Sequence, residues 1–259
     1  METGQYGDVR YLKIQKKNDY VSIKLFLYIV DGLLIDCGPQ SMEDEIIPFL
    51  KAEQPKMVAI THMHEDHCGM AAWIEQHMNI PIFVNPLDIP CANVKAVYPF
   101  YRQFTWGERN AFFPEPLGDI IKTDHYHFYA VDAPGHMPNH SVFFEEENGW
   151  LFTGDLYVHG HPRFAADTEN AKALIASLEK ILKLPFKTVF CAHAGILEDG
   201  RERIEKKLQY LLELQGKVDS MRARGMSDKE IDNDLFPDEK MTTAISEGQW
   251  ASIHLIRNI

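Results

Sequence analysis

Short apolar runs separated by polar segments fill the first part of the chain and predict β-strands. They cover residues 10–16, 20–36, 57–60 and 81–84. The dipeptide Asp31-Gly32 interrupts one of these runs and is typical of a hairpin turn. Two stretches between the runs have a helical pattern. One covers 41–51, with Ser41 as a candidate N-cap and acidic residues in its first turn, and the other covers about 69–77.

The same mixture of strands and helices continues in the second half of the chain. Strand patterns cover residues 125–132, 140–146, 150–153 and 188–191. Residues 170–182 place apolar side chains at helical spacing. The chain from 201 onward also has helical character, with Ser227 and Glu230 at the spacing of a capping box. Strands mixed with helices in both halves predict two sheets covered by helices.

Composition and charge limit the partners and the compartment. The 259 residues carry a net charge of -12 and no dense run of Lys or Arg, so we expect no nucleic-acid partner. The longest apolar stretch, 21–34, is interrupted by charges and is too short to span a bilayer. The N-terminus lacks the pattern of an export signal and none of the 4 cysteines forms a CxxC pair, so a cytoplasmic protein without membrane contact is expected.

A dense group of metal-binding residue types follows the apolar run at 57–60. His62, His64, Asp66 and His67 fall within six positions of one another. Imidazole nitrogen and carboxylate oxygen suit zinc, and also iron or manganese. Two residues at i and i+2 on an extended loop can share one metal, and the next pair can reach a neighbouring metal. A polar surface loop that is rich in His by chance is the weaker interpretation.

Three later segments each place one further candidate ligand directly after an apolar strand. These ligands are His136, Asp155 and His193. Scaffolds commonly place their chemistry on loops at strand ends. Taken alone, each residue would be an ordinary turn residue, but together with the earlier group they complete a set of seven candidate ligands.

On these residues the sequence resembles the metallo-β-lactamase superfamily over nearly the whole chain. The H-x-H-x-D-H motif of that family stands here at 62–67, and its later single ligands match the three residues just named, in order. Residues 33–38 also look like the early family strand that ends in Asp and Gly. The resemblance implies an α+β fold, a four-layer αββα sandwich of two mixed β-sheets. We expect this domain over residues 1–200, with a C-terminal helical extension over 201–259 packed on it.

The resemblance also implies how the ligands divide between two divalent metal ions, most simply two Zn²⁺. His62, His64 and His136 would hold one ion, Asp66, His67 and His193 the other, and Asp155 would bridge them. Two cations about 3.5–4 Å apart can share a water and lower its pKa toward about 7. The resulting hydroxide would attack a carbonyl, with Asp66 orienting it. The ligand set is most similar to the glyoxalase-II-like and lactonase-like branch, which predicts hydrolysis of a small ester, lactone or thioester.

Several residues around the motifs are candidates for contact with the substrate. His140 lies four positions after His136, and Tyr157 lies two positions after Asp155. Lactonases of this family place a Tyr one position later, where this chain has Val158, so the match to them is incomplete. The aromatic segment 98–113 could wall a pocket for an apolar acyl group, or form the contact of a homodimer.

Two other functional interpretations remain open at this point. Persulfide dioxygenases resemble the same fold and motif but use one iron, held by two His and one Asp. A non-catalytic binding module on the same scaffold is the third interpretation, although all seven ligand positions are filled. Bound metal and oxygen consumption would separate the first two, and a complete lack of activity would favour the third.

Overall fold

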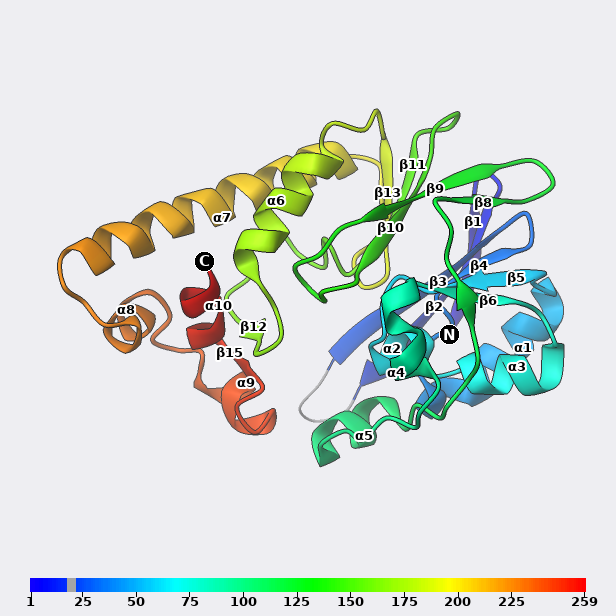
Figure 1. Cartoon of the computed structure of the whole chain (residues 1–259), viewed down its shortest axis with the longest axis horizontal. Helices are drawn as coiled ribbons and strands as arrows, with labels where there is room; N and C mark the ends of the chain where they lie inside the picture. The colour runs from blue at the N-terminus through cyan, green and yellow to red at the C-terminus, as the bar shows by residue number, and fades with distance from the viewer. Residues whose placement is uncertain (18–21) are drawn as a thin grey trace.

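A computed structural model describes residues 1–17 and 22–259 and contains two β-sheets packed face to face (Figure 1). Within these residues the first sheet has the strand order β1-β2-β3-β4-β5-β6-β7. The strands are β1 (Glu2–Tyr6), β2 (Val9–Lys17), β3 (Ser22–Val30), β4 (Leu33–Ile35), β5 (Met57–Ala59), β6 (Ile82–Val84) and β7 (Glu115–Pro116). The pairs from β1 to β4 are antiparallel and those from β4 to β7 are parallel, so the sheet is mixed.

The second sheet is also mixed. Its order among the described residues is β14-β13-β11-β10-β9-β8. The strands are β8 (Ile120–Lys122), β9 (His127–Asp132), β10 (Ser141–Glu145), β11 (Trp150–Gly154), β13 (Thr188–Cys191) and β14 (Gly195–Leu197). Only the pair β11 and β13 is parallel in this order.

Aromatic side chains fill the space between the two sheets. Tyr28 of the first sheet contacts Phe152 and Phe190 of the second, with ring centroids 5.8 and 5.4 Å apart, and these two phenylalanines stack on each other at 4.6 Å. All three rings are almost fully buried. Aromatic pairs at these distances add to the free energy gained by burying apolar area, so this layer fixes how the sheets face each other.

Helices cover the outer face of each sheet and complete four layers. On the first sheet lie α1 (Glu43–Glu53) and α3 (Ala71–Met78), and on the second lie α6 (Ala171–Ile181) and α7 (Gly200–Ala223) (Figure 1). Each pair buries one apolar stripe against its sheet, as amphipathic helices do. The structure therefore confirms the expected α+β αββα sandwich with helices at the C-terminal end.

Shorter elements connect the layers and extend the chain at its C-terminal end. They are η1 (Gln40–Met42), α2 (Glu65–Cys68), η2 (Pro86–Asp88), α4 (Ile89–Ala92), α5 (Phe100–Trp106), β12 (Ala165–Ala166), α8 (Asp228–Leu235), α9 (Lys240–Ile245), β15 (Trp250–Ala251) and α10 (Ser252–Asn258). β15 pairs antiparallel with β12, so the segment near the C-terminus is not continuously helical. In the described part of the chain no helix combines the length and the apolar character needed to cross a membrane.

The local predictions agree with the structure in most places. Asp31 and Gly32 form the expected turn, with φ of 48° and 82°, and Ser227 and Glu230 form a complete capping box. The prediction that Ser41 caps α1 is wrong. A turn of 3-10 helix precedes α1, and the Ser41 hydroxyl instead donates a hydrogen bond to the carbonyl oxygen of Thr105, at 2.9 Å. Positions 20–21 of the predicted strand 20–36 lie outside the described residues.

Candidate metal centre

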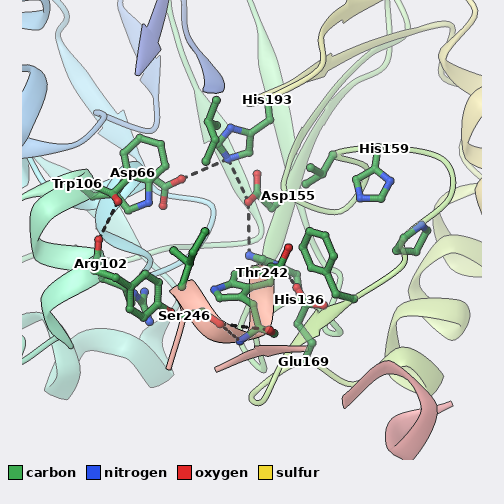
Figure 2. Close-up of a pocket in the computed structure, with 18 of the residues that line it drawn as sticks. Asp66, Arg102, Trp106, His136, Asp155, His159, Glu169, His193, Thr242 and Ser246 are labelled. Atoms are coloured by element: carbon green, nitrogen blue, oxygen red, sulfur yellow. Dashed lines mark hydrogen bonds and ion pairs between the residues drawn. The ribbon is translucent and has the colours of Figure 1, made fainter. Parts of the chain in front are cut away.

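The seven predicted ligands meet at one edge of the sandwich, where strands of both sheets end. Figure 2 shows four of them, Asp66, His136, Asp155 and His193. His62 and His64 follow β5, and the backbone of His64 is extended; α2 begins directly after His64 and carries Asp66 and His67. The change from extended to helical backbone turns the second pair toward a different position from the first. The other three ligands follow β9, β11 and β13.

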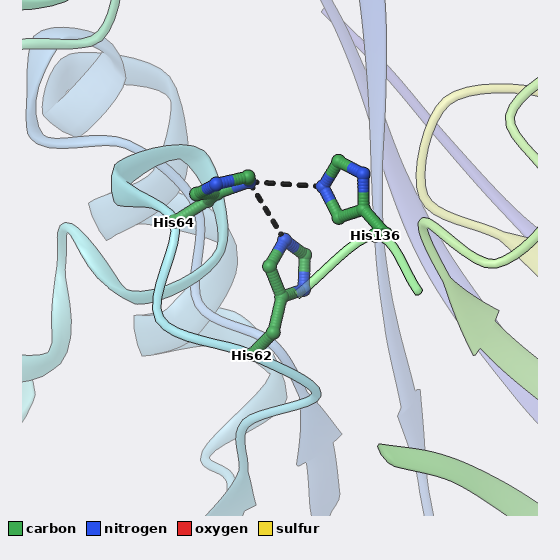
Figure 3. A group of neighbouring side chains, drawn as sticks. All are labelled: His62, His64 and His136. Carbon is green, nitrogen blue, oxygen red and sulfur yellow. Dashed lines mark hydrogen bonds between the residues drawn. The ribbon is translucent and has the colours of Figure 1, made fainter. Parts of the chain in front are cut away.

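Three histidines form the first ligand group, shown in Figure 3. The Nδ1 atom of His64 lies 3.1 Å from Nε2 of His62 and 2.9 Å from Nε2 of His136. Burial and the neighbouring rings lower the pKa of His62 and His64 well below the ordinary value, so both are neutral imidazoles. Neutral rings offer lone pairs, and three ring nitrogens that converge in this way suit one cation.

The second group combines two carboxylates with two imidazoles. Asp66, His67, Asp155 and His193 each offer an atom within 4.8 Å of the others. Nε2 of His193 lies 3.2 Å from Oδ2 of Asp66 and 3.3 Å from Oδ2 of Asp155. Among the described residues, neither Nε2 of His67 nor Oδ1 of Asp155 has a hydrogen-bond partner, although both atoms are buried. A divalent cation would bind the lone pairs of these unpaired atoms, so the residues present fit a metal ion.

Asp155 connects the two groups. Its Oδ1 lies 3.4 Å from Nε2 of His67, and its Oδ2 lies 3.5 Å from Nε2 of His136. Although burial opposes ionisation, the neighbouring His193 and His67 hold the pKa of the Asp155 carboxyl well below its usual range. The carboxylate is therefore charged and faces both groups of ligands.

Other side chains fix the orientation of the imidazole rings. Nδ1 of His67 lies 2.7 Å from Oδ2 of Asp36, and Nδ1 of His136 lies 2.6 Å from Oε1 of Glu169. Nδ1 of His193 lies 2.8 Å from the carbonyl oxygen of Lys24. An imidazole that donates from Nδ1 presents the lone pair of Nε2, which is the arrangement that metal-binding histidines adopt. Sequence reasoning gave no role to Glu169, because only the fold brings it to His136.

The two residues predicted to contact the substrate, His140 and Tyr157, are buried next to the candidate ligands. His140 is fully buried, and its Nε2 accepts a hydrogen bond from the backbone N–H of Asp155 at 3.2 Å. Tyr157 is 5 % exposed and packs in the core beneath α7. Neither residue lines the cavity beside the ligands. In the structure His140 contacts the backbone of Asp155, Tyr157 is buried two residues after it, and neither side chain forms part of this cavity wall.

A cavity of about 460 Å³ opens beside the second group. Asp66, Asp155 and His193 form part of its wall, so a ligand in the cavity would reach the candidate metal centre. Four residues of α5 form one side, at positions 101, 102, 105 and 106, and positions 242, 245, 246 and 250 of the C-terminal segment form another (Figure 2). The predicted aromatic segment 98–113 thus contributes to a pocket wall, while its residues Phe100 and Phe104 are exposed.

An ion pair joins the α5 wall to the motif. Arg102 donates hydrogen bonds from Nε and Nη2 to the two carboxylate oxygens of Glu65, and the first of these is 2.6 Å long. Glu65 lies between the ligands His64 and Asp66 in sequence and is 1 % exposed. Because the Glu65 carboxylate is buried, Arg102 provides its neutralising charge. The sequence places Glu65 inside the motif, but nothing in it indicates this partner.

Comparison with known proteins places this geometry in a family. The sequence model described as the metallo-beta-lactamase superfamily matches residues 28–193, which is more than half of the chain and includes all seven candidate ligands. The chain belongs to the metallo-β-lactamase superfamily. Membership confirms the family that the motif residues indicate, and together with hydrolase relatives it supports a metal-dependent enzyme.

Two proteins similar to this chain are named hydroxyacylglutathione hydrolases. The hydroxyacylglutathione hydrolase GloC of Haemophilus influenzae is 30% identical over 161 residues, which cover 57% of this chain and 73% of that protein. A hydroxyacylglutathione hydrolase of Legionella pneumophila (strain Corby) is 30% identical over 179 residues. That match covers 67% of this chain but only 62% of the Legionella protein, less than two thirds of its length.

Solved structures of the superfamily share the fold over almost the whole chain. A metallo-beta-lactamase family protein from Thermus thermophilus superposes with a TM-score of 0.70 at 18% identity, covering 97% of this chain and 93% of that one. A beta-lactamase domain protein from Burkholderia ambifaria gives a TM-score of 0.67 at 20% identity, covering 99% and 87%. At these identities the likeness establishes the fold alone.

Proposed function

We propose that the protein is a hydrolase that uses two divalent metal ions, most simply Zn²⁺, to cleave a small ester, lactone or thioester. In this proposal His62, His64 and His136 hold one ion, and Asp66, His67 and His193 hold the other. The observation that carries the proposal is the position of Asp155, whose two oxygens approach nitrogen atoms of both ligand groups. A carboxylate in that position suits a bridge between two cations.

Two bound cations would supply an activated water at neutral pH and would polarise the carbonyl of the substrate. The residues of the chain would provide the remaining requirements. The carboxylate of Asp66, whose pKa is held well below its usual range by His67 and His193 despite burial, would accept a hydrogen bond from the attacking water. Asp36 and Glu169 would hold the imidazole rings of His67 and His136 in the orientation that metal binding needs.

The cavity supports a substrate with an apolar acyl part. Aromatic rings of Trp106, Phe164 and Trp250 line it, together with aliphatic side chains. Burying apolar surface there contributes about 25 cal/mol per Å². The volume of about 460 Å³ lies in the usual range for pockets that bind small molecules.

A mononuclear iron oxidoreductase of the persulfide dioxygenase type is the second candidate. One metal held by two His and one Asp would leave four of the seven candidate ligands without a metal. The second group also brings its candidate ligand atoms close together. Two of its buried atoms have no hydrogen-bond partner among the described residues. This arrangement favours two ions and therefore the hydrolase.

The test combines metal analysis with a substrate screen. We expect plasma mass spectrometry of the purified protein to find about two zinc or manganese ions per chain, and the loaded protein to hydrolyse members of a panel of esters, lactones and thioesters. About one iron per chain together with oxygen uptake on persulfides would instead support the oxidoreductase. Full metal occupancy without activity on any of these substrates would favour a non-catalytic binding module.

A further inference from the structure

We infer that the cavity selects an uncharged substrate and disfavours anionic thioesters such as those of glutathione. The inference rests on the proposed hydrolase function and specifies its substrate class. It separates this chain from the relatives that are named hydroxyacylglutathione hydrolase. The charges of the cavity wall that are available to a ligand decide between neutral and anionic substrates.

Both cations in the wall already have partners. Arg102 and Lys207 are the Arg and Lys side chains that line the cavity in the described part of the chain. Two nitrogens of Arg102 bind the carboxylate of Glu65. Lys207 is 4 % exposed, and its Nζ donates to the carbonyl oxygens at positions 156 and 157, at 2.8 and 2.6 Å. Arg102 is therefore already paired with a carboxylate, and the Lys207 ammonium, buried against two carbonyl oxygens, is not presented to a carboxylate of the substrate.

The wall also contains one carboxylate outside the two candidate metal groups. Glu169 lines the cavity, and its carboxylate contacts the ring of His136, which is itself a candidate ligand. Desolvation and the nearby Lys207 lower the pKa of His159, so this exposed residue adds no cation near neutral pH. The peptide part of glutathione carries a net negative charge at neutral pH. Bringing that charge into this cavity would cost its hydration without a new ion pair.

Apart from the buried Lys207, the part of the wall that lies beyond the family match is apolar or bears hydroxyls. Residues 242, 245, 246 and 250 all follow the matched range 28–193. The Trp250 ring lies 6.4 Å from the ring of His136 and 6.0 Å from that of Phe164, so it forms an aromatic surface directly beside the candidate metal centre. The hydroxyl of Ser246 is hydrogen-bonded to the backbone of its own segment. An alkyl or aryl group fits this surface better than a charged one.

A matched pair of thioesters tests the charge preference. The two substrates share one acyl group, and the thiol part is N-acetylcysteamine, which is uncharged, or glutathione. We expect the metal-loaded protein to show a kcat/KM at least about tenfold higher for the uncharged thioester. An alkyl ester compared with its terminal carboxylate analogue extends the test to oxygen esters. An equal or reversed preference in the pairs that are cleaved would overturn the inference and leave the proposed function intact.

Failure of the proposed function gives a different result. If no ester, lactone or thioester is cleaved at full metal occupancy, the hydrolase proposal and this inference both fail. A binding measurement keeps the inference separate from turnover. We expect calorimetry with metal-free protein to detect tighter binding of the uncharged thioether analogue than of the glutathione thioether, and the opposite order would contradict the charge argument.

A variant that adds a cation to the wall provides the control. Thr242 lines the cavity on α9. Thr242→Lys should shift the kcat/KM ratio toward the glutathione thioester by roughly fivefold, because one partly screened ion pair becomes available. Thr242→Met adds a side chain of similar length without charge and should leave the ratio unchanged. An equal shift in both variants would show that volume, not charge, sets the preference and would overturn the inference.

Discussion

The carboxylate of Asp155 faces both groups of candidate ligands, and a single substitution tests whether it serves both. Asp155→Ala should lower metal content per chain and reduce turnover by more than about a hundredfold. Removing a residue that only supports a metal ligand already lowers metal affinity or activity by roughly 10–100-fold. Plasma mass spectrometry and initial rates on the best substrate provide the measurements.

Asp155→Asn is the matched control for that substitution. The amide keeps the shape of the side chain but removes the negative charge that would balance the two proposed cations. We therefore expect partial metal occupancy and low activity in this variant. Near-normal activity and metal content in Asp155→Ala would remove the bridging role.

Glu169 allows a second test at the level of one residue, because it touches a candidate ligand without being one. Glu169→Gln weakens the hydrogen bond that orients the His136 ring, so metal affinity should fall by roughly 10–100-fold. Titration of metal-free protein with Co²⁺, followed by its visible spectrum, reports the change. Glu179→Gln on the exposed face of α6 is the control and should bind as the unchanged protein does. Equal affinity in both variants would show that Glu169 does not position the ring.

At the scale of elements, the sequence predicts those whose apolar pattern is strong. The buried strands and the helix α6 follow such patterns, and they appear close to the predicted bounds. The strand β1 was not predicted, because Glu2–Tyr6 is mostly polar and exposed and is held by pairing with β2. The pair β12 and β15 was also missed, since two-residue strands carry no period.

Some residues of the candidate site could be predicted from the sequence, and others could not. All seven candidate ligands follow apolar strands in sequence, so their convergence at the strand ends was predictable. The partners Glu169 and Arg102 could not be found in this way, because they reach the site from distant segments through tertiary packing. The sequence places His140 and Tyr157 near His136 and Asp155, on two different loops, and in the structure both side chains are buried outside the cavity wall. Proximity in sequence does not tell which side of a loop faces the cavity.

One polar side chain of the helix α7 reaches the loop that follows Asp155. This contact predicts that a substitution there changes the rate of the proposed reaction. Lys207 donates hydrogen bonds to the two carbonyls that follow Asp155, in a loop where Val158 has a φ of 48°. Such a conformation is strained for a β-branched residue, so the loop depends on its surroundings. Lys207→Met should lower kcat by roughly tenfold or more with a smaller change in KM, because Asp155 is less well positioned. Unchanged kcat would contradict this role.

The stability of the same variant should depend on pH with a defined sign. Burial lowers the pKa of Lys207 from 10.5 to about 8. Between these values the unfolded chain binds more protons than the folded one, so the free energy of unfolding gained from this group rises with pH. The stabilisation is absent below about pH 8 and complete above about pH 10.5. We expect urea unfolding to show wild type gaining stability relative to Lys207→Met across that range, and a difference that falls as pH rises would contradict the assignment.

At the scale of the whole molecule, the candidate centre joins both sheets, so metal removal should weaken the entire fold. The ligands come from loops after β5 and β9, β11 and β13, on opposite sheets. A cation that binds only the folded state stabilises it by about 2.7 kcal/mol at a concentration a hundredfold above its Kd. Chelation should therefore lower Tm by roughly 5–10 °C, and added zinc should restore it. Asp155→Ala should show a much smaller response, and an equal response would place the stabilising metal elsewhere.

The division of the chain into a superfamily domain over 1–200 and a helical extension over 201–259 leads to the final prediction. We propose that the extension is part of one cooperative unit, because α7 buries Ile204, Leu211 and Val218 completely against the core that α6 shares. Removing 201–259 should expose this apolar surface and prevent stable folding. Leu211→Ala in the full chain should cost about 2–5 kcal/mol of unfolding free energy. Urea unfolding followed by circular dichroism and by tryptophan fluorescence should give one coincident transition, and a soluble, cooperatively folded 1–200 fragment would show that the domain is independent of its extension.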